Sequence, residues 1–226
     1  MADMYSRTEK LIGSAGVEKI KKSKIFIAGL GGVGSWAAEA AARSGFGRIT
    51  VADGDMIDQT NRNRQLYALS STEGEKKALL AQRRIRDINP ECVVTSLCIR
   101  LTPENLCEYI SPDTDFLLDA TDDLPVKVAM AKYCEKQGIF MVSSMGTGKK
   151  LDITRLRVTD IYKTEVCPMA KAVRALCRRE GVNALKCVWS DEPVSHSSGD
   201  MPSMVFVPAA AGLLAVKTMV EYLLKE

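Results

Sequence analysis

Hydrophobic positions in this chain form short, unbroken apolar runs, and longer segments with helical periodicity lie between them. The runs predict strands at residues 24–28, 48–52, 93–99, 116–119 and 139–143. The intervening segments predict helices at residues 33–43, 75–88, 103–110 and 125–137. Strands that are apolar throughout are typical of sheets buried on both faces. The alternation therefore predicts an α/β fold with a doubly wound, mostly parallel sheet and helices on both faces.

The pattern changes after Gly148. Residues 156–159 and 185–190 predict later strands that complete the sheet, with a helix at 169–179 between them and a last helix at 208–224. We find no internal repeat and expect one domain of residues 1–226. Residues 1–23 form a helical arm, 24–148 the core and 149–226 a C-terminal part.

Composition excludes several classes of protein. The hydrophobic fraction of 46% is ordinary, and we expect no membrane-spanning run because none is long enough. The start, MADMYSRTEK, is too polar for a secretory signal, so a cytoplasmic protein without a membrane partner is expected. Seven cysteines without a C-x-x-C pair argue against structural zinc and a disulfide framework. A net charge of +3 neither requires nor excludes a nucleic-acid partner.

A glycine-rich turn follows the first predicted strand in KIFIAGLGGVG. Its glycines are Gly29, Gly31, Gly32 and Gly34. The unpaired amides and the dipole of the following helix favour a phosphate there, and glycine allows the phosphate close to the backbone. Asp53, at the end of the next strand, is placed to accept hydrogen bonds from a ribose, and we assign Asp55 to the same site. The core is therefore predicted to be a Rossmann-like nucleotide-binding unit.

The loop QTNRNRQ distinguishes between kinds of nucleotide. Asn61, Arg62, Asn63 and Arg64 stand together, and we assign Gln65 to the nucleotide site with them. A dehydrogenase has no need of two guanidinium groups here, whereas a triphosphate does, because Arg offers paired donors to phosphate oxygens. The loop therefore favours ATP over a nicotinamide dinucleotide.

These motifs resemble, in order and over nearly the whole length, the ThiF/MoeB/ubiquitin-activating superfamily of adenylating enzymes. The resemblance implies that the glycine turn and Asp53 contact adenosine and ribose, and that Asn61 and Arg64 face the triphosphate. Lys77 in EGEKKALL matches the phosphate-binding lysine of the family. Lys76 is a rival for Lys77, and Arg62 for Arg64.

Two further positions extend the resemblance. Asp122 in ATDD matches the aspartate associated with Mg²⁺, and Arg7 in MYSRTEK resembles an arginine that reaches the ATP site of the neighbouring subunit. ATP, Mg²⁺ and a homodimer completed in trans are therefore implied. Asp122 also fits a helix N-cap, alone or in addition. Arg7 also fits an exposed side chain in a frayed terminus.

Several segments resemble one branch, the tRNA threonylcarbamoyladenosine dehydratases. They are GVGSWAAEAAARSG, INPEC, SSMGTGKKLDITRLRVTDIYKTEVCPMAKAVR and LKCVWSDEP. The resemblance implies that ATP activates the carboxylate of a threonylcarbamoyl group next to the anticodon of tRNA, and that the side chain then cyclises with loss of water. The alternative is an activator of a small ubiquitin-like sulfur-carrier protein, and a sulfur-transfer partner stays open. A non-enzymatic nucleotide-binding scaffold would make Asp122 or Arg64 dispensable.

Two cysteines and one histidine are weaker candidates. Cys167 precedes a predicted helix, whose dipole would favour a thiolate, and Cys187 ends a predicted strand. Either could form a transient thioester, but a buried, inert thiol explains both equally simply. His196, the only histidine, lies in the loop 191–203, which we expect to order upon binding of ligand.

Basic residues of the C-terminal part are candidates for contact with tRNA phosphates. They are Lys149, Lys150, Arg155, Arg157, Arg174, Arg178 and Arg179. Charges of this kind also serve as ordinary solubilising residues, so this surface is a hypothesis.

Overall fold

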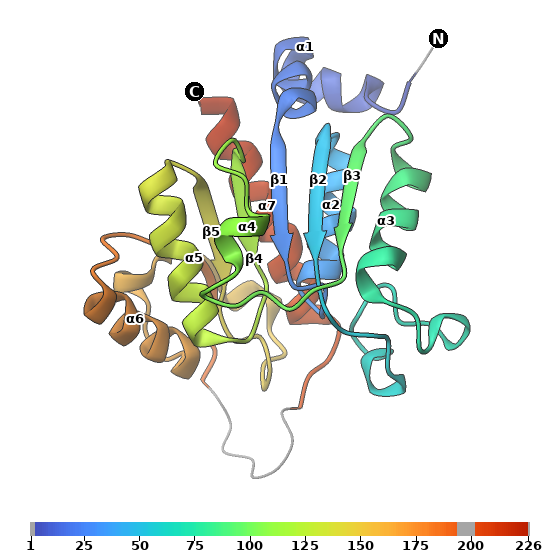
Figure 1. Ribbon diagram of the computed structural model, residues 1–226. Coiled ribbons are helices and arrows are strands. Elements are labelled where there is room, and N and C mark those ends of the chain that lie inside the picture. The colour runs from blue at the N-terminus through green and yellow to red at the C-terminus, as the bar shows by residue number, and fades with distance from the viewer. Residues whose placement is uncertain (1–2, 194–201, 226) are drawn as a thin grey trace.

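The computed structural model describes residues 3–193 and 202–225, which form a sheet covered by helices on both faces (Figure 1). The sheet has seven strands in the order β3-β2-β1-β4-β5-β7-β6. Their bounds are β1 Lys24–Ala28, β2 Arg48–Ala52, β3 Val93–Leu97, β4 Phe116–Asp119, β5 Phe140–Ser144, β6 Leu156–Asp160 and β7 Lys186–Ser190. All pairings are parallel except the one between β6 and β7.

The strand order places a binding crevice at a defined point. β1 pairs with β2 on one side and with β4 on the other, so the chain reverses its direction across the sheet at β1. In doubly wound sheets, ligands bind outside the carboxyl ends of the strands at this point. The loops after β1, β2 and β4, which carry the predicted nucleotide-binding residues, all emerge there.

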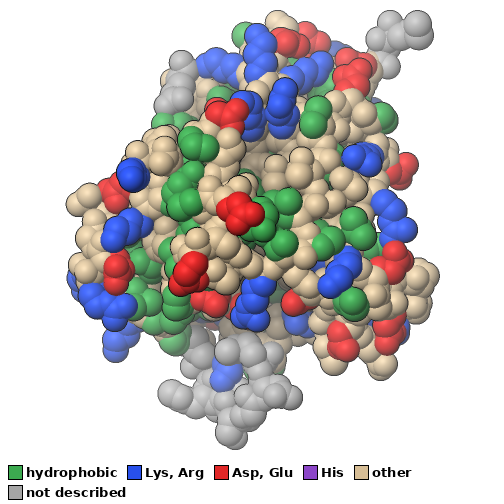
Figure 2. Space-filling view, in the orientation of Figure 1, with side chains coloured by type: hydrophobic (Ala, Val, Ile, Leu, Met, Phe, Trp, Pro, Cys, Tyr) green, Lys and Arg blue, Asp and Glu red, His purple; other side chains and the backbone are tan. Residues whose placement is uncertain are grey.

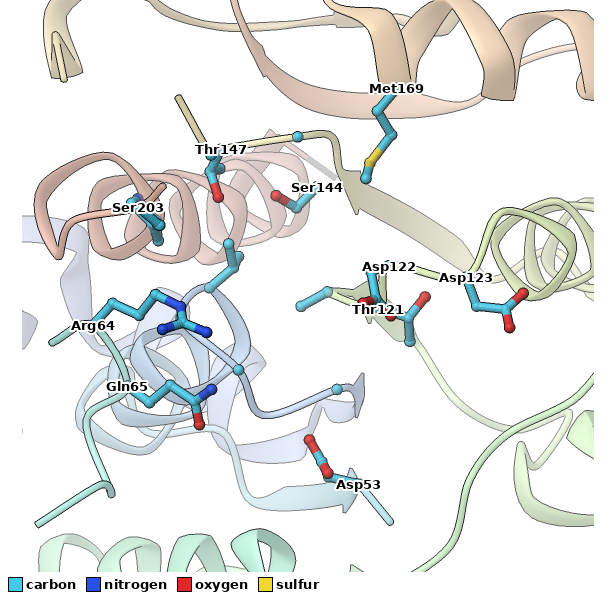
Figure 3. Close-up of a pocket in the computed structure, with 18 of the residues that line it drawn as sticks. Asp53, Arg64, Gln65, Thr121, Asp122, Asp123, Ser144, Thr147, Met169 and Ser203 are labelled. Carbon is cyan, nitrogen blue, oxygen red and sulfur yellow. The ribbon is translucent and has the colours of Figure 1, made fainter. Parts of the chain in front are cut away.

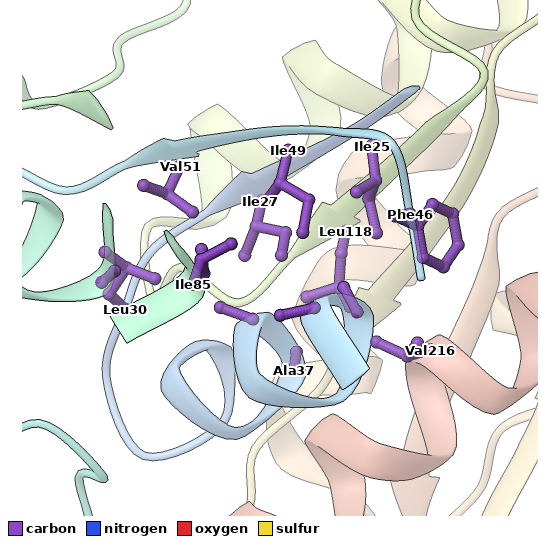
Figure 4. Packing of buried hydrophobic residues seen from close by; sticks show 14 of the residues in the cluster. Ile25, Ile27, Leu30, Ala37, Phe46, Ile49, Val51, Ile85, Leu118 and Val216 are labelled. Atoms are coloured by element: carbon purple, nitrogen blue, oxygen red, sulfur yellow. The ribbon is translucent and has the colours of Figure 1, made fainter. Parts of the chain in front are cut away.

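Two groups of helices cover the two faces. α1 Ser6–Lys22, α2 Gly34–Ser44, α3 Lys77–Ile88 and α7 Phe206–Lys225 share one hydrophobic core with the sheet. α4 Leu106–Tyr109, α5 Leu124–Gln137 and α6 Pro168–Glu180 share the other. In the first core, Ile25, Ile27 and Ile49 point from the strands toward Ala37 of α2 and Val216 of α7 (Figure 4). The predicted doubly wound architecture is confirmed.

The last helix corrects one expectation from composition. α7 has a mean hydropathy of 1.4 and is long and apolar enough to cross a membrane by those two criteria alone. In this fold one face of α7 packs in the core, and 39% of its apolar window is buried. A Cβ atom at Gly212 would lie only 2.4 Å from the carbonyl oxygen of Val33, so α7 packs closely against the start of α2. Ala211, Ala215 and Met219 continue the buried face of α7.

Two local differences from the predicted elements have physical causes. The helix expected at residues 103–110 is reduced to α4, because Asn105 and Thr102 form a turn in which the Asn105 Oδ1 accepts from the Thr102 amide at 2.8 Å. β6 lies at the sheet edge and runs antiparallel, so its side chains are only half-buried and its apolar pattern is weak.

Candidate active site

A cavity of about 890 Å³ opens at the carboxyl ends of β1, β2, β4 and β5. One wall carries Arg64 and Gln65, the opposite wall carries Asp122, and Asp53 closes one side (Figure 3). Ser144, Thr147 and Met169 line a further part, which we call the second lobe: residues 144–150 and 167–169. The volume suits a nucleotide together with part of a second substrate.

The glycines of the turn have two separate roles. Gly29 has a φ of +83°, and a Cβ atom at Gly34 would lie 1.8 Å from the Gly29 carbonyl oxygen, so both glycines allow the turn to pack against itself. A Cβ atom at Gly31 would have only Gln65 Nε2 for a neighbour, at 4.0 Å. Gly31 therefore opens onto the cavity, whereas Gly34 does not line it. The Asp53 carboxylate fixes the turn by accepting the Leu30 amide at 2.6 Å.

The asparagine and arginine loop places Arg64 in the cavity, packed on Gly32. Its guanidinium donates to the Thr60 carbonyl at 2.9 Å, and the Arg64 carbonyl accepts from Trp36 Nε1 at 3.1 Å. Asn61 lies beside it and also lines the cavity. Arg62 instead forms an ion pair with Glu73 outside the cavity. The structure thus favours Arg64 over Arg62 as the arginine of the nucleotide site.

The structure also distinguishes between Lys77 and Lys76 as candidates for phosphate binding. Lys77 is buried at the start of α3, lines the cavity, and places its Nζ 2.9 Å from Asp55 Oδ2. Lys76 turns to the Gly54 carbonyl at 3.2 Å. Lys77 and Asp55 therefore present a paired cation and anion to a ligand.

Asp122 is not the N-cap of the following helix. Asp123 has that role, with its carboxylate accepting the Val126 amide at 3.2 Å. Among the described residues, no hydrogen bond or ion pair involves Asp122, which lines the cavity. Within residues 3–193 and 202–225 there is no group of three His, Cys, Asp or Glu side chains that could hold a metal ion alone. The residues fit Mg²⁺ that binds through one or two carboxylates and the phosphates of a nucleotide.

One strained backbone position lies in the second lobe and another lies beside it. Lys149 has a φ of 60° and Val166 a φ of 47°, and a β-branched residue rarely adopts that conformation. Cys167 is buried at the N-cap of α6 and faces the lobe beside Gly146. Lys150 is buried there as well and donates to the Ser190 and Glu192 carbonyls, and this burial lowers the pKa of Lys150. Strain of this kind is concentrated at functional sites.

Three candidates lie away from the cavity. Cys187 is fully buried in β7, with its Sγ 3.5 Å from the Thr159 carbonyl of the neighbouring β6, and burial raises its pKa to about 12. This placement argues against the covalent role considered for Cys187. Arg7 is exposed on α1, which lies at the end of the sheet opposite the cavity (Figure 1), so it cannot serve its own site. His196 and most of loop 191–203 lie outside the described residues.

The proposed tRNA-contacting cations are largely engaged within the protein. Arg155 and Arg157 both form ion pairs with Asp191, and Arg174 donates to the Thr164 carbonyl at 2.7 Å. In Figure 2, Lys and Arg side chains gather where α1 lies and otherwise alternate with acidic ones. The expected basic surface of the C-terminal part is therefore weaker than its residue count suggests.

Residue patterns did not reveal the buried network beneath the site. Lys127 and Asp119 are fully buried and form an ion pair of 2.9 Å, with Ser143 and Ser144 beside them. The sequence signal that could have revealed this network is Asp119, which follows the apolar residues FLL in the buried strand FLLD. A charge in a strand buried on both faces needs a buried partner.

Together, the switch-point crevice, the glycine turn at the start of α2 and the opposed Arg64 and Asp122 walls define a nucleotide-binding enzyme of the Rossmann type. The ThiF family model matches residues 5–226, and the chain belongs to the ThiF family. The resemblance seen in the motifs is thereby confirmed.

Individual relatives indicate which branch of the ThiF family this chain resembles. A tRNA threonylcarbamoyladenosine dehydratase of Bacillus subtilis (strain 168) is 42% identical over 245 residues, covering 100% of this chain and 96% of the relative. The crystal structure of the E. coli dehydratase TcdA in complex with ATP has a TM-score of 0.93 at 34% identity, over 98% of this chain and 94% of that chain. The ThiS adenylyltransferase of B. subtilis (strain 168), which acts on a sulfur-carrier protein, is 36% identical but covers only 62% of this chain and 42% of that relative.

Proposed function

We propose that this protein uses ATP to dehydrate threonylcarbamoyladenosine next to the anticodon of tRNA, by activating its carboxylate. The carrying observation is a cavity in which the space between Arg64 and Asp122, where we place the triphosphate, continues into the second lobe, where we place the acyl group. The similarity to dehydratases over the full length of the chain supports this choice of acyl substrate.

The residues present fit ATP. Gly31 leaves room for phosphate oxygens at the start of α2, and Arg64 and Lys77 supply cationic donors to them. The Gln65 Oε1 is buried, lines the cavity and has no hydrogen-bond partner among the described residues, as expected of an acceptor that awaits a ligand. Asp53 lies at the end of β2, where a ribose would be held.

Mg²⁺ would be held by Asp122 together with the phosphates, where it would supply charge neutralisation on the leaving group. The chain's own cations act on the same charge: Arg64 and Lys77 hold the phosphates in line with the second lobe. Catalysis of this type depends on alignment and electrostatic stabilisation more than on covalent chemistry by the protein.

The reaction balances without a protein nucleophile. A carboxylate oxygen of the threonyl group attacks the α-phosphorus of ATP and displaces pyrophosphate, or it attacks the γ-phosphorus and displaces ADP. A nucleophile of the same side chain then attacks the acyl carbon and loses its proton, and the acyl–oxygen bond breaks to release AMP from the acyl adenylate or phosphate from the acyl phosphate. The oxygen removed from the substrate departs on the nucleotide or phosphate. Cys167, which faces the second lobe, could assist, and full turnover by Cys167→Ser would exclude that role.

We further propose a homodimer in which Arg7 of one subunit completes the site of the other. Arg7 is exposed at the far end of its own subunit, which leaves it available to a partner.

The test is incubation of the purified protein with ATP, Mg²⁺ and one acyl substrate at a time. Modified tRNA should stimulate release of pyrophosphate or phosphate, whereas unmodified tRNA should not. A small carrier protein that ends in Gly-Gly should have no effect. Stimulation by the carrier protein alone would instead establish an activator of sulfur carriers.

A further inference from the structure

A fully buried ion pair lies directly beneath the Asp122 wall and the second lobe of the cavity. The Lys127 Nζ donates to Asp119 Oδ2 at 2.9 Å and to the Ser144 carbonyl at 2.8 Å. The Ser143 hydroxyl also donates to Asp119 Oδ2, at 2.5 Å. Lys127 and Asp119 have no exposed side-chain area, so neither contacts a ligand in the cavity.

This network joins three elements at the point where they reach the site. Asp119 ends β4, Ser143 and Ser144 end β5, and Lys127 lies in the first turns of α5. The loop that carries Asp122 runs from β4 to α5, and the loop of the second lobe begins at the end of β5. Lys127 therefore links the wall on which we place Mg²⁺ to the wall on which we place the acyl substrate.

The backbone on both sides of Asp122 is fixed through the same network. The second carboxylate oxygen of Asp119, Oδ1, accepts hydrogen bonds from the Thr121 amide at 3.0 Å and the Thr121 hydroxyl at 2.7 Å. These two bonds fix the residue before Asp122. Asp123 caps α5, and its carbonyl accepts the Lys127 amide at 3.0 Å, which fixes the residue after it. Asp122 has no other described support, so its position depends on these contacts.

We infer that Lys127 is a positioning residue: it sets the separation between the Asp122 loop and the second lobe, and so aligns the metal-bound triphosphate with the acyl substrate. This inference rests on the proposed function. A buried ion pair is a costly way to obtain stability alone, because desolvation offsets most of the attraction. Its location beneath the Asp122 loop and the second lobe gives it a use that an apolar pair would lack.

The test separates positioning from folding. Lys127→Met leaves the Asp119 charge buried without a partner and is expected to lower the melting temperature strongly. The double variant Lys127→Met, Asp119→Asn removes that charge and keeps an acceptor for Thr121, so it should regain most of the stability. If positioning is the role, kcat of the double variant stays about 10- to 100-fold low, as for other residues that orient a metal ligand. Lys132→Met, an exposed lysine on the same helix, is the matched control and should change nothing.

A second measurement is independent of turnover. Calorimetric titration of ATP at a series of Mg²⁺ concentrations should show that the double variant needs about tenfold more Mg²⁺ than wild type for the same affinity, whereas binding of ATP without Mg²⁺ is unchanged. If the double variant does not fold, Ser143→Ala replaces it, with an expected fall in kcat of about fivefold. A folded variant with wild-type kcat and wild-type Mg²⁺ dependence would overturn the inference. A wild-type protein that leaves modified tRNA unchanged would refute the proposed function instead, and the Mg²⁺ titration would still judge Lys127.

Discussion

Two alanine substitutions in the glycine turn should separate binding from folding. A methyl group at Gly34 would meet the Gly29 carbonyl oxygen at 1.8 Å, a backbone atom that cannot rotate away. A methyl group at Gly31 would have its nearest neighbour at 4.0 Å, within the cavity, and the φ of Gly31 is not positive. Gly34→Ala should therefore damage the fold, and Gly31→Ala should damage only the site.

The sizes of the two effects follow from the geometry. Overpacking against immovable backbone costs about 3 kcal/mol, which lowers the melting temperature of a domain of this size by roughly 6–12 °C for Gly34→Ala. Gly31→Ala should leave stability unchanged or raise it by about 0.4–1 kcal/mol, because alanine restricts the unfolded chain. The methyl group would keep phosphate oxygens from a backbone amide, and loss of one charged hydrogen bond weakens ATP binding about 10- to 100-fold.

Thermal unfolding by circular dichroism and ATP titration by calorimetry measure both quantities on the same samples. Gly138→Ala lies at the C-cap of α5, outside the cavity, where the φ of 73° disfavours alanine. It should lower stability by about 1–2 kcal/mol and leave ATP binding unchanged, so it controls for binding lost through destabilisation alone. The reasoning is refuted if Gly31→Ala binds ATP as well as wild type, or if Gly34→Ala unfolds at the wild-type temperature.

Three further predictions concern other parts of the molecule. Burial raises the pKa of Glu39, but hydrogen bonds from Arg84 and Arg43 outweigh this effect and lower the pKa below its ordinary value. Glu39→Gln should therefore lower the free energy of unfolding in urea by about 1–2 kcal/mol at neutral pH. This difference between variant and wild type should vanish as the pH falls through the folded-state pKa of Glu39. Iodoacetamide should label the exposed Cys98 of the native protein and spare Cys187, as mass analysis of peptides would show; equal labelling of both would contradict the buried assignment. Arg7→Ala and Asp122→Ala should each abolish turnover, and mixing the two proteins should restore part of it through hybrid dimers; no recovery in the mixture would argue against a shared site.

The sequence predicts those parts of the fold that depend on local pattern. The strands β1, β2 and β4 begin and end at the predicted residues, since each is an apolar run buried on both faces. The direction of β6 was not predictable, because an antiparallel edge strand has the same local pattern as a parallel one. The short α4 was overestimated for a related reason: its turn depends on side-chain hydrogen bonds rather than on periodicity.

The site shows the same division. Spacing and residue type were enough to bring Asp53, Arg64 and Lys77 to one cavity, because the carboxyl ends of parallel strands meet. The role of Asp123 rather than Asp122 as helix cap required backbone geometry. The ion pair between Lys127 and Asp119 joins α5 to β4 through the core. The sequence pattern around either residue does not identify the other as its partner.

The central claim is that the cavity activates a carboxylate with ATP, and it is tested most directly by following the oxygen that leaves. Modified tRNA whose threonyl carboxylate carries a heavy oxygen isotope is incubated with the protein, ATP and Mg²⁺, and the products are analysed by mass spectrometry. The account predicts a nucleoside lighter by one water, with one heavy oxygen atom in the AMP or in the phosphate released. Heavy oxygen that appears only in water, or a nucleoside that keeps its mass while ATP is consumed, would contradict it.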